Sequence, residues 1–202
     1  MKTRFLDGWP LLGSLSLVLL VMSGVFLASQ GGDVAGVRAV IRLTARTSLF
    51  LFALAFSARA MATLWPCSLT QWQRRNRRQL GLAFAVSHTL HAVAIVTFAR
   101  MDPAGFREHV MPATLVSGGI AYVFILAMAA TSFDRAVAWM GPSAWRALHW
   151  MGGYYLWLSF IVTNGKRIGQ SPLYALPVVL MLVVFMLRIA ARRRGRPVSL
   201  IA

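Results

Sequence analysis

The stretch from residue 74 to residue 101, RRNRRQLGLAFAVSHTLHAVAIVTFARM, limits most what this chain can fold into. A cluster of arginines ends abruptly, and an apolar run begins at Leu80. At ~1.5 Å per residue, such a run crosses the ~30 Å hydrocarbon core of a bilayer as a helix. His88 and His91 lie inside the run, and imidazoles within a spanning helix are rare and usually functional. The stretch therefore predicts a transmembrane helix that carries a functional site.

The composition favours a membrane protein over a nucleic-acid-binding protein. Hydrophobic residues make up 58% of the chain and charged residues 13%, against ~25% charged in a soluble domain. The formal charge of +16 comes from basic residues that cluster at the ends of apolar runs, as membrane flanks do. We therefore expect the lipid bilayer, and no nucleic acid, as a partner. The single cysteine, Cys67, excludes an intramolecular disulfide and a cysteine-based zinc site.

Six apolar segments predict an all-α fold with six transmembrane helices in one domain, residues 1–202. The runs are continuous rather than alternating, which disfavours a spanning β-barrel. We expect the first run to be a retained span rather than a signal peptide, because it is long and lacks a clear cleavage site. The predicted spans are about 9–29, 45–65, 79–100, 111–132, 145–164 and 173–191.

The distribution of lysine and arginine predicts that both termini are cytoplasmic. Loops and ends on the cytoplasmic side of a membrane protein carry more of these residues. One side collects Lys2, Arg4, Arg74, Arg75, Arg77, Arg78, Arg135, Arg146, Arg192, Arg193, Arg194 and Arg196. The other side collects fewer: Arg38, Arg42, Arg46, Arg100, Arg107, Lys166 and Arg167.

Three histidines in the apolar segments are candidate iron ligands. His88 and His91 share a helix face one turn apart, and His149 lies in the fifth segment, within AWRALHWMGGYYLWL. Two imidazoles on facing helices make a six-coordinate, electron-transferring haem. We therefore expect His149, with His88 or His91, to hold a b-type haem. Arg59, within the second segment, would meet a haem propionate.

Each of these residues also has a structural interpretation. The histidines would hydrogen-bond across helices, and Arg59 would extend to the interface. The aromatic residues around His149 would form an interfacial belt, with Gly152 and Gly153 allowing close helix packing. His109 lies in a polar loop, where a solvated histidine is expected.

Two sequence motifs resemble a known family. Arg77-Arg78, Leu80-Gly81-Leu82 and Leu90-His91 resemble its third-span motif. Ala130-Thr131-Ser132, Gly141, Trp145 and Leu148-His149 resemble its fourth-to-fifth-span motif. The family is the ferric-reductase-like transmembrane superfamily, and within it the haem-binding MsrQ subunits. The resemblance covers roughly residues 45–165. It implies six helices, b haem, and electron transfer across the bacterial inner membrane to or from a protein partner.

The chain departs from the family pattern at two positions. The family usually has a further histidine thirteen residues after the one that matches His149, where this chain has Val162. Two-haem members of the superfamily carry a second ligand on the third span. The matching position here falls near Arg77, which is not a histidine. In addition, His91 lies ~17 Å past the start of its run, but His149 only about a turn into its own. A tilted haem, or a fifth helix that begins near Pro142, would close this gap.

The leading hypothesis is thus a cytochrome b-like membrane protein that relays electrons as a subunit of an oxidoreductase. Because no Gly-rich dinucleotide fingerprint occurs, quinol or a separate reductase would supply the electrons. The alternative is a haem-free accessory or assembly subunit of a larger membrane complex. A small-solute transporter is a weaker alternative, because few polar groups lie within the apolar runs.

Overall fold

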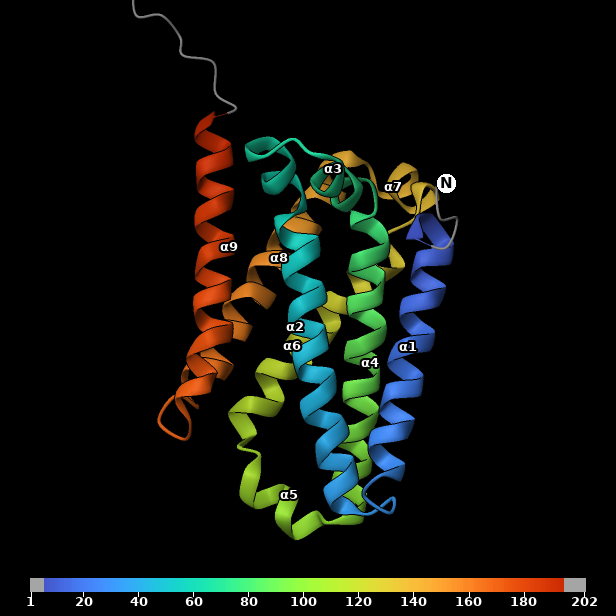
Figure 1. The fold of residues 1–202 in the computed structure, drawn as a ribbon, viewed down its shortest axis with the longest axis vertical. Helices are drawn as coiled ribbons and strands as arrows, with labels where there is room; N and C mark the ends of the chain where they lie inside the picture. Colours follow the sequence, from blue (N-terminus) through green and yellow to red (C-terminus); the bar gives the residue numbers. More distant parts are fainter. Residues whose placement is uncertain (1–5, 195–202) are drawn as a thin grey trace, which may run out of the picture.

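A computed structural model describes residues 6–194, and within this range every regular element is helical (Figure 1). The long helices are α1 (Gly8–Ala28), α2 (Val34–Leu64), α4 (Arg77–Met101), α6 (Pro112–Ala130), α8 (Pro142–Gly165) and α9 (Ala175–Arg194). The short elements are α3 (Ser68–Arg75), α5 (Pro103–His109), α7 (Asp134–Met140) and a 3₁₀ turn at Pro172–Tyr174. The predicted all-α fold is confirmed for this part of the chain.

Five of the helices within residues 6–194 are long and apolar enough to cross a membrane: α1, α2, α4, α6 and the segment Pro172–Arg194, which contains α9. The fifth predicted span corresponds to α8, which has 24 residues. Its length would suffice for a crossing, but tyrosines, tryptophans, His149 and Asn164 make it less apolar than the other five. The structure therefore supports five of the six predicted spans by composition.

The long helices run side by side as a bundle (Figure 1). The described start of α1 and the end of α9 lie at the same end of the bundle, together with α3 and α7, and α5 lies at the opposite end. At the α5 end, a guanidinium nitrogen of Arg38 lies 3.4 Å from Nε2 of His109. At the α3/α7 end, Arg78 of α4 pairs with Asp134 of α7. Within residues 6–194, the two sets of basic residues that the sequence separates thus lie at opposite ends.

Helices α2 and α4 form the centre of the bundle, and small polar residues fill the seam between them. Ser87 of α4 is fully buried, and its Oγ lies 2.9 Å from Oγ of Ser48 and 2.8 Å from Oγ of Thr47. Short side chains let two helix backbones approach closely, as is common in membranes. By contrast, α1, α6 and α9 expose large apolar side chains such as Leu17, Val123 and Leu176, which suits contact with lipid.

The connections contain more helix than the sequence indicated. The connection between the second and third predicted spans contains α3, and the polar loop that holds His109 contains α5. Asp102 caps α5 by accepting a hydrogen bond from the Gly105 amide at 2.9 Å, which satisfies one of the free N–H groups of the first turn. The second segment is also longer, because Val34–Leu64 is one continuous helix of 31 residues.

Candidate functional site

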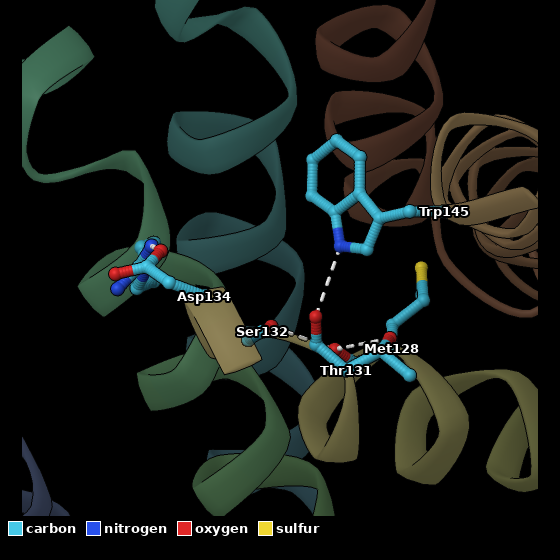
Figure 2. A network of polar contacts seen from close by, with 6 residues as sticks. Met128, Thr131, Ser132, Asp134 and Trp145 are labelled. Carbon is cyan, nitrogen blue, oxygen red and sulfur yellow. Dashed lines mark hydrogen bonds and ion pairs between the residues drawn. The ribbon is translucent and has the colours of Figure 1, made fainter. Parts of the chain in front are cut away.

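The start of α8 positions His149. Gly141 has a φ of +82°, a conformation that glycine adopts at no steric cost, and Pro142 follows at the first helical position. One turn later, the indole N–H of Trp145 donates a 2.9 Å hydrogen bond to the carbonyl of Thr131 (Figure 2). The rings of Trp145 and His149 lie 4.3 Å apart. Trp145 therefore fixes the start of α8 against the end of α6, and His149 packs on its indole.

The turn that accepts this hydrogen bond is itself held in place. Ser132 Oγ donates to the carbonyl of Met128 at 2.6 Å, and Thr131 Oγ1 donates to the carbonyl of Ala127 at 2.7 Å. Figure 2 shows Trp145 pointing across the gap to this turn, with Asp134 at its edge. Nε2 of His149 lies 3.4 Å from Thr131 Oγ1, which exceeds the usual length of a hydrogen bond. The imidazole nitrogen is therefore only weakly engaged.

His149 lies in the wall of a cavity of about 250 Å³, called the His149 cavity below. Five helices contribute to it. Its wall comprises Phe52, Ala55 and Phe56 of α2; Arg77, Arg78, Gly81, Phe84 and Ala85 of α4; Ile125, Met128, Ala129 and Ser132 of α6 and the turn after it; Val137 of α7; and Trp145, His149, Gly153 and Leu156 of α8. Ligand sites have this character, with an apolar lining and a few convergent polar groups.

The polar groups of the cavity lie at its α3/α7 end. Arg77 and Arg78 are exposed by area although both side chains line the cavity, so they mark its mouth. Arg78 also forms an ion pair with Asp134, whose carboxylate is 87% exposed. An exposed ion pair of this kind stabilises a fold by ~0–1 kcal/mol. Arg78 can therefore exchange Asp134 for another anion at little cost. The mouth is thus cationic and the interior is apolar with one imidazole.

Arg188 on α9 borders the same region, and our sequence reasoning missed it. Its Nη1 donates to the carbonyl of Phe56 at 2.6 Å, and its Cζ lies 3.8 Å from the centroid of the Phe56 ring. Nε of Arg188 is buried and has no hydrogen-bond partner within the described residues. A charged residue inside the last apolar run is the signal that would have identified it.

His88 and His91 lie in a different environment. The His88 ring packs among aromatic rings, with centroids 5.4 Å from Phe84, 5.0 Å from Tyr122 and 6.3 Å from Phe160. Its Nδ1 is buried without a hydrogen-bond partner in the described part of the chain. The hydroxyl of Tyr122 donates to the backbone carbonyl of His88 at 3.0 Å. His88 therefore contributes to the packing of α4 against α6 and α8.

His91 connects α4 to α2. Its Nδ1 lies 3.1 Å from the carbonyl of Ile41 and 3.0 Å from Oγ1 of Thr44. A carbonyl only accepts, so Nδ1 carries the proton and Nε2 holds the free lone pair. Ser87, next to His88 in the sequence, contacts serine and threonine hydroxyls of α2 rather than a histidine ring.

The structure does not bring His149 together with His88 or His91. The α8 residue beside His88 is Phe160, eleven residues after His149 in the sequence. Along a helix this separation is ~16 Å. Five residues of α4 line the cavity with His149, from Arg77 to Ala85, and neither His88 nor His91 is among them. Helix α8 does begin at Pro142, as expected. Even so, His149 and the pair His88 and His91 lie at different depths along the bundle.

The remaining candidates lie outside the cavity wall. Arg59 is exposed on α2, so the structure neither brings it into the His149 cavity nor gives its side chain a partner within residues 6–194. His109 lies at the α5 end, where Nδ1 contacts the carbonyl of Gly105 at 2.7 Å. Its solvated position agrees with the sequence interpretation.

The chemistry available at the His149 cavity follows from these groups. An imidazole binds a transition metal, guanidinium groups bind carboxylates in a bidentate manner, and the aromatic and aliphatic wall excludes water. No group of three or more histidine, cysteine or acidic residues that would hold a bare metal ion occurs in residues 6–194. The cavity thus suits a flat apolar ligand with acidic substituents better than a hydrated ion.

Comparison with known proteins agrees with this geometry. No curated protein and no solved structure matches the chain significantly. A family model described as "Ferric reductase like transmembrane component" matches residues 43–161, more than half of the 202 residues. The matched range contains every residue of the cavity wall. The chain is therefore a multi-pass membrane protein that belongs to the ferric-reductase-like transmembrane family, whose domain indicates a role in membrane electron transfer.

Proposed function

We propose that the chain is a b-type haem-binding subunit that relays electrons across a bacterial inner membrane to or from a protein partner. The observation that carries this proposal is the convergence of the two sequence motifs on one cavity. Arg77, Arg78 and Gly81 come from the first motif, and Trp145 and His149 come from the second. Residues separated by about 70 positions thus meet around one imidazole.

The wall residues fit an iron porphyrin. His149 would supply a nitrogen ligand to the iron, and Arg77 and Arg78 at the mouth would hold the two propionates as charge-assisted pairs. The volume of about 250 Å³ is slightly below the usual ~300–1,000 Å³ of ligand sites. Met128 and the two arginines have flexible side chains whose rotation widens the cavity. The haem, when bound, supplies one-electron redox chemistry.

The chain's own residues would insulate this reaction. Phe52, Phe56 and Phe84 line the cavity, and their ring centroids lie within 5.5 Å of one another in successive pairs. Such a dry wall keeps water from the iron and lowers the local dielectric constant. Quinol or a separate reductase would supply the electrons, because the chain carries no recognisable nucleotide-binding motif.

Absorbance spectroscopy tests the proposal. We expect the purified protein to show a Soret band and reduced-minus-oxidised b-type bands, and His149→Ala to abolish them. His109→Ala is the matched control, because His109 is an exposed histidine at the opposite end of the bundle. Absence of any Soret band from protein expressed with sufficient haem would refute the proposal.

The pairing of His149 with His88 or His91 remains a prediction that the same spectra test. Loss of the haem bands in His88→Ala or His91→Ala would favour that pairing, and retention would favour His149 alone. Arg59 likewise remains a predicted propionate partner. Arg59→Gln should change haem retention only if the guanidinium reaches the cavity mouth.

The haem-free alternative is favoured by one observation. His88 and His91 already have packing and hydrogen-bonding roles, so their presence alone does not require a cofactor. An accessory or assembly subunit would use the same bundle to contact partner helices. Purification of the chain in a stoichiometric membrane complex without haem would support this function instead.

We further propose six membrane crossings with both termini and α3 on the cytoplasmic side. The α3/α7 end carries the larger set of basic residues, which supports this orientation. Cys67 is the only cysteine and is exposed beside α3. A membrane-impermeant maleimide should label Cys67 in inverted vesicles but not in intact spheroplasts. A Cys67→Ser, Gln170→Cys variant, with the thiol between α8 and α9, should show the reverse pattern, and the same pattern for both would refute an α8 crossing.

A further inference from the structure

We propose that His149 is the sole protein ligand to iron in the His149 cavity, so that the opposite iron face is open to a small exogenous ligand of the carbon monoxide type. This inference rests on the proposed function and goes beyond electron relay. It derives from the chemistry of the cavity wall, which is different on its two sides.

The wall that faces α8 carries no iron ligand. It is formed by Phe52, Ala55 and Phe56 of α2 and by Gly81, Phe84 and Ala85 of α4. None of these side chains contains a nitrogen, oxygen or sulfur atom. The remaining α4 residues of the wall are the two arginines, and guanidinium groups stay protonated in proteins and offer no lone pair.

Met128 is the other wall residue with a soft donor atom, but it lies on the same side as His149. Its Sδ is only 2.8 Å from the position of a Cβ built on Gly152, and Gly152 lies on α8 one turn after His149. A sulfur packed against α8 does not face a nitrogen that projects from α8. His149 and Met128 therefore do not form an opposed pair across a porphyrin.

The other two membrane histidines do not reach this level. Phe160, at the level of His88, lies ~16 Å along α8 from His149. Two ligands to one iron must each approach to ~2 Å, as imidazole does with other transition metals. His91 lies three residues beyond His88 on α4, further from the cavity wall, whose last α4 residue is Ala85. A histidine from outside the cavity thus does not complete the coordination.

Spectroscopy of the whole protein in detergent or nanodiscs tests this inference. We expect the haem-loaded ferrous protein to be high-spin, and carbon monoxide to shift its Soret band at stoichiometric occupancy. His88→Ala and His91→Ala should respond to carbon monoxide in the same way as the wild type.

An introduced ligand provides the matched variant. Gly81 lies on the facing wall, and a Cβ there meets no other atom within 4 Å. Gly81→His should convert the spectrum to low-spin and abolish the carbon monoxide shift. Gly119→His, at an open position of α6 outside the cavity wall, should leave both unchanged.

Each outcome decides between the proposals. A wild-type protein with haem bands that is low-spin and does not respond to carbon monoxide would overturn the single-ligand inference and leave the proposed function intact. The same result, reversed to a carbon monoxide response by His88→Ala or His91→Ala, would identify the second ligand. Absence of haem bands would overturn the proposed function and this inference with it.

Discussion

The close contact between α6 and α8 predicts that Gly152→Ala separates these helices. A Cβ at Gly152 would lie 2.8 Å from Sδ of Met128, 3.1 Å from its Cε and 3.1 Å from Cδ1 of Phe124. The methionine end can rotate away. The Phe124 ring is restrained, because it packs against Tyr155 with centroids 5.3 Å apart. We therefore expect α8 itself to shift, which would disturb the side of the cavity that carries the imidazole.

The size of this effect follows from two opposing contributions. Replacing a helical glycine by alanine stabilises by up to ~1 kcal/mol, and overpacking a filled contact costs ~1–3 kcal/mol. Gly119→Ala on α6 is the matched control, because its Cβ meets nothing within 4 Å and only the first contribution applies. Gly152→Ala should thus be ~1–3 kcal/mol less stable than Gly119→Ala. The comparison is measured by unfolding in mixed micelles, followed by circular dichroism. Equal stabilities would refute the α6–α8 contact.

Two further predictions concern the rest of the bundle. Ser87→Ala should destabilise the fold by ~1–3 kcal/mol, because it leaves the buried hydroxyl of Ser48 without a partner. The exposed Ser117→Ala should change the unfolding free energy little, and equal effects would contradict the polar seam. Hydrogen bonds from the backbone amide and the hydroxyl of Thr70 hold the pKa of the Cys67 thiol below its usual value. Because a lowered pKa preserves thiolate as the pH falls, maleimide labelling of Cys67 should persist at lower pH than labelling of Thr70→Val, and identical pH profiles would contradict this.

The helical class and the site's motifs were predictable from sequence because each depends on local patterns. Apolar runs of membrane-spanning length fix where the long helices lie, and the order of arginine, glycine and histidine residues identified the family. The short helices α3, α5 and α7 were missed because they are polar or brief and lack a strong apolar period. For Arg188, the charge inside an apolar run is a local signal, but its contact with Phe56, 132 residues away in the sequence, is one that no local pattern predicts.

The depths of the histidines along their helices show what residue spacing alone can predict in such a bundle. Helices α4 and α8 run in the same direction (Figure 1), so a constant sequence offset relates residues at the same depth. The ring contact of His88 with Phe160 sets that offset at about 72 residues. Any pair of ligands on these helices must obey it. None of the chain's histidines does, since this offset pairs His88 with Phe160 and His149 with Arg77 rather than with another histidine. The offset thus leaves His149 without a histidine at its depth on α4, which supports the proposal of His149 as the sole protein ligand to the cofactor.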